Sequence, residues 1–140
     1  MIHLVGFAPI YQPDFKRLNL EWLDKFGLTE SHDLEILDDP EGTVIARGGF
    51  IFLAMDGDKV IGTAGLWKES GLEYELIKMT VDPQYRGRGI SKLLLEECIG
   101  KARDSGAVKI SLFSNSQLTT ALKLYQKYGF KHVAVTGAPF

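Results

Sequence analysis

The 140-residue sequence has a single cysteine, Cys98, and only three histidines. One thiol cannot close an intrachain disulfide, and the histidines lack the spacing of metal ligands, so we expect neither disulfides nor a metal site. Cys98 falls on the apolar stripe of a predicted helix, which indicates burial rather than a nucleophile. No apolar run approaches the roughly 20 residues that cross a bilayer, and the first residues lack a secretion signal. We therefore expect a cytoplasmic protein with no membrane association.

Length and composition indicate one globular domain covering residues 1–140. The chain is 45% hydrophobic and 24% charged, and a chain of this size can bury about two-thirds of its unfolded surface. The net charge of −2 hides an asymmetry, because residues 1–70 carry −6 and residues 71–140 carry +4. This split is either chance on a solvated surface, or a basic half that binds an anion and an acidic half that faces a cation.

Hydrophobic periodicity predicts strands and helices in mixed order. The predicted strands cover residues 2–9, 50–55, 60–67, 74–81, 108–113 and 132–135. The predicted helices begin near Pro13 and end before Gly27, run from Ser31 to Asp38, begin at Ile90 and end before Gly106, and cover residues 118–128. Turns at residues 56–57 and 70–71 place the second to fourth strands in an antiparallel meander. The order of elements predicts a mixed α/β (α+β) domain around one sheet.

Residues 82–91, Asp-Pro-Gln-Tyr-Arg-Gly-Arg-Gly-Ile-Ser, connect a predicted strand to a predicted helix. Gly87 and Gly89 allow the main chain to turn with its N–H groups pointing inward. The first turn of the helix leaves further N–H groups unsatisfied, and Arg86 and Arg88 add positive charge. The segment is typical of a phosphate or diphosphate site, the alternative being an ordinary glycine-rich connection.

Two familiar nucleotide-binding motifs are absent from this segment. A Walker A loop would end in Gly-Lys-Ser/Thr, which does not occur here, and Lys92 stands where the dinucleotide fingerprint has its third glycine. A different anion is therefore expected.

Two separated motifs resemble those of one enzyme family. Residues 86–91 are similar to the Arg/Gln-x-x-Gly-x-Gly/Ala signature, and residues 81–85 are similar to the stretch that precedes it. Residues 121–125, Ala-Leu-Lys-Leu-Tyr, with Gly129-Phe130, resemble the pattern Ala-x-x-Leu-Tyr…Gly-Phe. Both motifs are those of the GNAT superfamily of acyl-CoA-dependent N-acyltransferases, and the element order is similar from about Leu4 to Val135.

This resemblance implies a mostly antiparallel sheet whose fourth and fifth strands are parallel and splayed, flanked by helices. It also implies acetyl-CoA or coenzyme A as co-substrate, with its pantetheine arm along Met79, Thr80 and Val81. The diphosphate would lie on the main chain of Arg86, Gly87, Arg88, Gly89, Ile90 and Ser91, where Ser91 replaces the usual Gly or Ala. Asn115 lies three residues before the family's usual asparagine position, so it is either a cofactor contact or a helix cap.

Amine acylation needs a base, because a lysine-like amine has a pKa near 10.4 and is almost entirely protonated at pH 7. Glu75 matches the position of the base in histone-type GNAT enzymes. On a regular strand it would share a face with Ile77, Met79 and Val81. The alternatives are Glu73, a water relay, or a purely structural carboxylate at position 75.

Departure of the coenzyme A thiolate calls for an acid, and Tyr125 occupies the family's general-acid position. Tyr125 also belongs to an apolar stripe, so packing is the alternative role. Main-chain N–H groups near Met79 could polarise the thioester carbonyl.

These observations predict an N-acetyltransferase that moves acetyl from acetyl-CoA to a primary amine of a small molecule or peptide. The alternative is a non-catalytic acyl-CoA sensor. The basic residues are interleaved with core positions, which argues against nucleic-acid binding. The sequence ends at Phe140, soon after the last predicted strand begins, and the exposed sheet edge would be covered by a loop, by a partner chain or by a truncated segment. Both a monomer and a homodimer are compatible with this ending.

Overall fold

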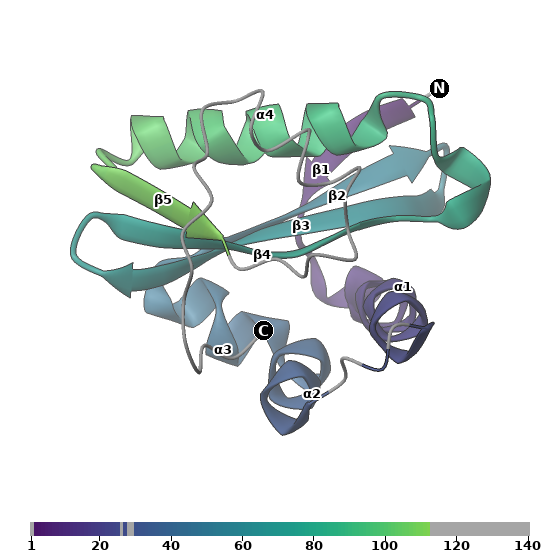
Figure 1. Cartoon of the computed structure of the whole chain (residues 1–140), viewed down its shortest axis with the longest axis horizontal. Helices are drawn as coiled ribbons and strands as arrows, with labels where there is room; N and C mark the ends of the chain where they lie inside the picture. The colour runs from purple at the N-terminus through teal and green to yellow at the C-terminus, as the bar shows by residue number, and fades with distance from the viewer. Residues whose placement is uncertain (1, 26, 28–29, 113–140) are drawn as a thin grey trace.

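The computed structural model describes residues 2–25, 27 and 30–112, and these contain one five-stranded sheet in the order β1-β2-β3-β4-β5 (Figure 1). The strands are β1 (Ile2–Gly6), β2 (Phe50–Asp56), β3 (Lys59–Ser70), β4 (Glu73–Val81) and β5 (Lys109–Leu112). Strands β1 to β4 pair antiparallel, and β5 pairs parallel to β4. The structure thus confirms the predicted α/β class, the meander and the parallel fourth and fifth strands.

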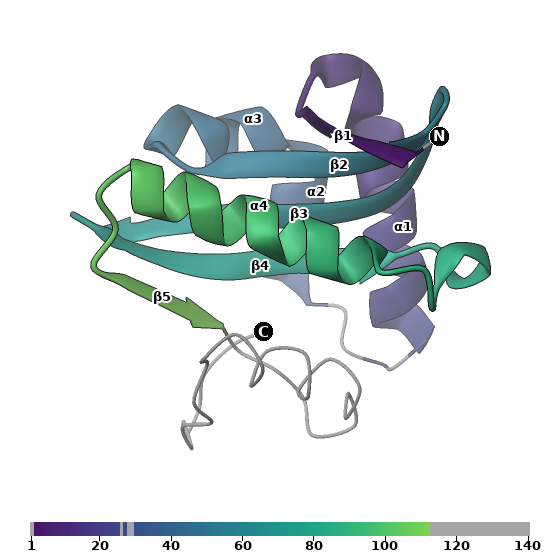
Figure 2. The same ribbon diagram turned by 90° about the horizontal axis from the view of Figure 1, so that it is seen from above.

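Helices cover both faces of the sheet (Figures 1 and 2). The helices are α1 (Gln12–Lys25), α2 (Ser31–Asp38), α3 (Pro40–Thr43) and α4 (Ile90–Asp104). Short 3-10 turns occur at Pro9–Tyr11 (η1), Ile45–Arg47 (η2) and Pro83–Tyr85 (η3). Among the described helices, α4 lies on one face, and α1, α2 and α3 lie on the other. No helix in the described part of the chain is both long and apolar enough to cross a membrane.

Strand β2 shows how the sequence divides the core into two layers. Its side chains alternate, so that Phe50, Phe52 and Ala54 contact the α4 layer while Ile51, Leu53 and Met55 contact the α1–α3 layer. Gly62 of β3 permits the close approach of α4, because a Cβ at this position would lie 3.1 Å from Cδ1 of Leu94. Leu94 is fully buried there, a burial that contributes about 2 kcal/mol.

The predicted second helix has the observed bounds Ser31–Asp38, and its ends follow local rules. Glu30 and Asp33 form a reciprocal capping box at its start. Pro40 prevents α2 from continuing, yet it also occupies the first turn of α3, which Asp39 caps by accepting a hydrogen bond from the Gly42 N–H. The predicted helix at 118–128 and strand at 132–135 lie outside the described residues.

Candidate active site

Strand β4 contains a β-bulge in the half that follows Glu75. The β3–β4 pairing runs from Gly65↔Ile77 to Thr63↔Thr80, so two residues of β4 lie opposite the single residue Ala64 of β3. Lys78, in the bulge, has φ +52 and is the only non-glycine residue with positive φ in the described chain. A left-handed conformation costs an ordinary residue about 1–2 kcal/mol, so the surrounding contacts must hold it.

The prediction that Glu75, Met79 and Val81 share one face of the sheet is wrong because of the bulge. Ile77 packs against the α1–α3 layer, whereas Val81 lies in the α4 layer and Met79 packs against that layer. The extra residue shifts the alternation by one position, so that side chains before and after it point to opposite faces. Glu75 therefore faces the α1–α3 layer, and Met79 and Val81 lie on the other side.

Glu75 lies half-buried on β4, opposite Trp67 of β3 and Ser111 of β5. Burial, and after it the hydrogen bond and the charge of the neighbouring Glu69, together raise the pKa of Glu75 to about 8, against the opposing effect of the Lys78 ammonium. A carboxylate with this pKa is a far better base toward an ammonium group than an ordinary glutamate. Perturbed carboxyl groups of this kind concentrate at functional sites.

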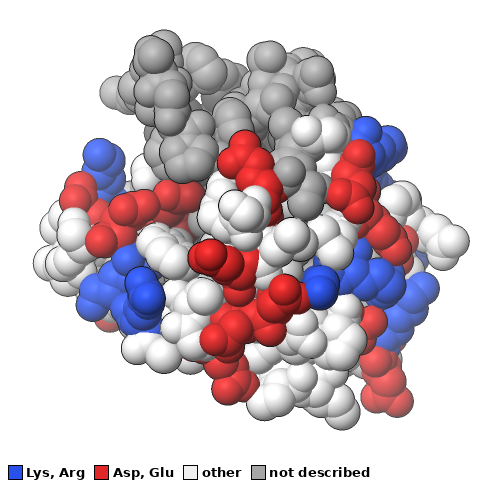
Figure 3. Space-filling model, turned by 90° about the horizontal axis from the view of Figure 1, so that it is seen from below, with Lys and Arg blue, Asp and Glu red and all other residues white. Residues whose placement is uncertain are grey.

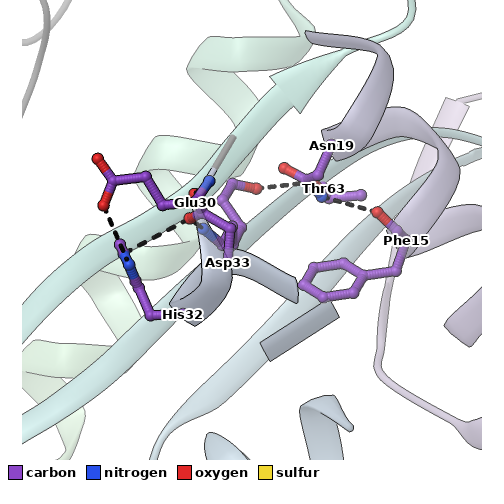
Figure 4. A network of polar contacts seen from close by, with 7 residues as sticks. Phe15, Asn19, Glu30, His32, Asp33 and Thr63 are labelled. Carbon is purple, nitrogen blue, oxygen red and sulfur yellow. Dashed lines mark hydrogen bonds and ion pairs between the residues drawn. The ribbon is translucent and has the colours of Figure 1, made fainter. Parts of the chain in front are cut away.

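A buried polar network surrounds the bulge (Figure 4). The side-chain amide of Asn19 donates to the Phe15 carbonyl at 2.8 Å and to Thr63 Oγ1 at 3.0 Å, and the Thr63 hydroxyl donates to the Lys78 carbonyl at 2.7 Å. On the other side, the Lys78 ammonium forms an ion pair with Asp33 of α2. The bulge is thus tied to α1, to α2 and to β3.

Sequence reasoning missed this network. Asn19 falls on the apolar face of α1, four residues after Phe15, and Asp33 is a fully buried acid on the inner face of α2. A polar residue at a core position, such as Asn19 or Asp33, is a signal that sequence reasoning could have used. The pairing of Asp33 with Lys78 could not have been predicted, because the two residues are 45 positions apart in the sequence.

The segment between β4 and α4 forms an exposed glycine loop. Gly87 and Gly89 have φ of +80 and +77, and a Cβ at either position would meet nothing within 4 Å. Gly89 is the N-cap of α4 and offers no side-chain cap. No acceptor elsewhere in residues 2–25, 27 and 30–112 pairs with the main-chain N–H groups of residues 87–91. As far as the described residues go, the loop is therefore open to an anion, and its own side chains do not fill it.

Tyr85 anchors the base of this loop. Its hydroxyl donates to Asp56 at 2.7 Å, which lowers the pKa of that carboxyl and raises the pKa of the phenol. The guanidinium of Arg88 lies 4.9 Å from the centre of the Tyr85 ring, and the ammonium of Lys59 lies 5.4 Å from it. Arg86 and Arg88 are exposed, so both charges are available to a phosphate.

The second half of β4, which is predicted to contact the cofactor, has a neighbouring strand on one side only within the described residues. Ile77, Thr80 and Val81 pair with β3, with the bulge residues 78 and 79 between them, while β5 pairs with Glu73–Leu76 within the described residues. The main chain of Met79, Thr80 and Val81 thus follows the last β4–β5 pair of the described residues, Leu76↔Leu112. This geometry suits the predicted pantetheine contact.

The structure describes Cys98 but not Tyr125 or Asn115. Cys98 is buried, and burial raises the pKa of its thiol to about 12, which removes it as a nucleophile. Tyr125 and Asn115 lie outside the described residues, and their predicted roles stay predictions. The described residues contain no group of three or more His, Cys, Asp or Glu side chains that could hold a metal ion.

A mixed sheet, a glycine loop before α4 and a carboxylate on β4 are the features that the resemblance to acyl-CoA-dependent acyltransferases implies. Residues 10–130 match the family model described as Acetyltransferase (GNAT) family. The chain therefore belongs to the GNAT acetyltransferase family, and the predicted resemblance is confirmed.

Relatives and solved structures agree with this assignment. The N-alpha-acetyltransferase RimI of Mycobacterium tuberculosis is 36% identical over 85 residues, which cover 59% of this chain and 52% of that protein. A GNAT-family acetyltransferase from Staphylococcus aureus has the same fold, with a TM-score of 0.88 at 24% identity over 99% of this chain and 90% of that one. A predicted acetyltransferase from Clostridium acetobutylicum, solved with acetyl-CoA, has a TM-score of 0.77 at 17% identity over 95% and 92%. The matched region spans between 23% and 70% of the length of curated relatives.

Proposed function

We propose that this protein transfers acetyl from acetyl-CoA to a primary amine by direct attack of the amine on the thioester. The observation that carries the proposal is the glycine loop at the start of α4, whose main-chain N–H groups, beside Arg86 and Arg88, have no acceptor among the described residues. The diphosphate of coenzyme A would be held there, and its pantetheine arm would follow residues 79–81. The thioester supplies the activated acetyl group.

Glu75 is the proposed base. It removes the proton from the ammonium form of the acceptor, directly or through one water, and the freed lone pair forms the new bond to the acetyl carbon. As the carbon–sulfur bond breaks, Tyr125 is the proposed donor of a proton to the leaving thiolate. The pKa of Glu75 is about 8, which is about two units below that of a lysine-like amine, whereas an ordinary glutamate lies about six units below it. Proton transfer from the ammonium group to Glu75 is therefore much less unfavourable.

The proposed acceptors are cationic amines, such as polyamines, amino sugars, basic drugs or lysine side chains. The outer surface of α2 and α3 carries many acids (Figure 3). The exposed ones are Glu30, Glu35, Asp38, Asp39 and Glu41. A negative potential on this face raises the local concentration of cations next to the layer that Glu75 faces.

The test is release of free thiol from acetyl-CoA in the presence of a polyamine, an amino sugar and a lysine peptide. We expect release above background with at least one acceptor, and a loss of kcat of about 10²-fold or more in Glu75→Gln. Tyr125→Phe should also lower kcat. Glu73→Gln separates the two candidate bases, since only the true base should give the large loss.

The sensor alternative gives a different pattern in the same experiment. A sensor would bind acetyl-CoA in a calorimeter yet release no thiol with any acceptor, and Glu75→Gln would leave its affinity unchanged. Failure to bind acetyl-CoA at all would contradict both functions.

A further inference from the structure

The strongest feature that the proposed chemistry does not use is the network around the β4 bulge, which we name the bulge clamp: Asn19, Asp33, Thr63 and Lys78. Asn19 is 3% exposed, Asp33 and Thr63 are fully buried, and the Lys78 side chain is 8% exposed. These residues come from α1, α2, β3 and β4. A polar network buried this deeply ties four separate elements to one strained residue.

We propose that the clamp residues are positioning residues for the cofactor strand, with the Asp33–Lys78 ion pair holding residue 78 in its left-handed conformation. This inference rests on the proposed function in one respect, which is that residues 79–81 contact the cofactor. The clamp fixes the main chain of these residues and thereby the face on which each side chain lies.

The two anchors of Lys78 act on different parts of the residue. The Thr63 hydroxyl holds the Lys78 carbonyl, and because the peptide that follows is planar and trans, this also sets the direction of the Met79 N–H. Asp33 holds the far end of the side chain. With both ends fixed, the bulge cannot relax into regular pairing, which would return residues 79–81 to the other register.

Stability alone is a poor reason for a charged pair at this position. Buried ion pairs lose about as much in desolvation as they gain in attraction, and apolar side chains of similar volume often serve as well or better. Buried charges can instead select one conformation among several, and here the conformation selected is an unfavourable one for lysine. Asp33 is also braced, because its second carboxylate oxygen accepts the Glu30 N–H at 3.0 Å.

The clamp also joins the two sides of the proposed reaction. Asp33 belongs to α2 in the layer that Glu75 faces, while Lys78 belongs to the strand predicted to hold the cofactor. The ion pair therefore connects α2, which lies on the side proposed for the acceptor, to β4, whose residues 79–81 are proposed to contact the cofactor. Loss of the pair should release the strand without opening the glycine loop, which is built from local sequence.

The experiment compares four variants by thermal melting, by calorimetric acetyl-CoA binding and by amide hydrogen exchange at residues 77–81. Lys78→Met removes the ammonium partner of the buried Asp33 carboxylate and leaves it with only the Glu30 N–H and the His32 ring among the described residues, so it should lower the melting temperature sharply. The double variant Asp33→Asn with Lys78→Met removes both charges but keeps a side-chain oxygen that can accept the Glu30 N–H, and it should regain most of that loss. Lys78→Arg keeps the pair. Lys16→Met is the control, because it breaks the exposed Lys16–Asp38 pair between α1 and α2, the two helices that contribute Asn19 and Asp33 to the clamp.

We expect the double variant to exchange the amides of residues 77–81 at least tenfold faster than the wild type, despite its recovered melting temperature. Its affinity for acetyl-CoA should fall about tenfold. Lys78→Arg and Lys16→Met should stay within about threefold of the wild type in both measurements.

Wild-type exchange rates and affinity in the stable double variant would overturn the proposal and leave the pair a purely structural feature. A wild type that does not bind acetyl-CoA would contradict the proposed function instead. In that case the exchange rates still decide whether the clamp holds the bulge, because they need no ligand.

Discussion

The proposed role of Glu75 as a base sets two opposing requirements on its pKa. A base must be ionised to accept a proton, yet it must also hold that proton against a basic amine. With a pKa of about 8, roughly a tenth of the protein has an ionised Glu75 at pH 7. We expect kcat/KM to rise with pH through about 8 in the wild type, measured with an acceptor at saturating acetyl-CoA.

The substitution Glu69→Gln tests the origin of this pKa. Glu69 raises the pKa of Glu75 through its hydrogen bond and its charge, so its removal should move the rise in kcat/KM to lower pH. Glu73→Gln is the matched control, being another acid near the same end of the β3–β4 pair, for which no effect on the Glu75 pKa is expected. An unchanged profile in Glu69→Gln would mean that burial alone sets the pKa.

The same raised pKa makes stability depend on pH. The folded-state pKa of about 8 exceeds the ordinary value of 4.5, so the folded protein binds this proton more tightly than the unfolded chain does. The contribution is fully present below about 4.5 and is lost as the pH rises through about 8. The melting temperature of Glu75→Gln should therefore fall less than that of the wild type across this interval. Parallel melting curves would contradict the assignment of the raised pKa to Glu75.

The glycine loop is an element whose function depends on main-chain shape. Gly89→Ala should bind acetyl-CoA at least tenfold more weakly, because Gly89 has φ +77 and a Cβ there would project into the open space assigned to the diphosphate. Gly71→Ala is the matched control, since Gly71 has φ +49 with equally open surroundings in the β3–β4 turn. Both variants should lose about 1–2 kcal/mol of stability. Equal affinities in calorimetry would exclude the loop as the diphosphate site.

The same two elements show what can be predicted from sequence. The glycine loop, the meander and the bounds of α2 depend on residues close in the chain, and their patterns were sufficient to predict them. The bulge of β4 could not be predicted, because its residues alternate in the ordinary way and the extra residue becomes visible only when β4 is paired with β3. The left-handed conformation of residue 78 could not be predicted either, because glycine is the residue expected at such a position and a lysine occupies it. The face of Glu75 was therefore predicted correctly relative to Ile77 but wrongly relative to Met79.

The charge asymmetry of the whole chain now has a spatial counterpart. Acids gather on the face that carries α2 and α3 (Figure 3), where five of the twelve acids of the first half are exposed. The arginines of the loop at the start of α4 belong to the second half. An anionic cofactor and a cationic acceptor would thus approach different parts of the molecule. Long-range attraction of this kind accelerates encounter and is weakened by salt, with little effect on the chemical step.

The double variant Glu35→Gln with Glu41→Gln tests this separation. For a polyamine acceptor we expect KM to rise severalfold, kcat to stay constant, and the increase of KM with salt to become shallower, because two exposed charges that attract the cation are gone. The matched control is Glu96→Gln with Glu97→Gln, which removes the same charge from the exposed surface of α4 on the opposite face of the sheet. Initial rates at low and high ionic strength distinguish the two. Equal effects of both pairs would show that net charge alone matters, and that the acidic surface of α2 and α3 does not guide the acceptor.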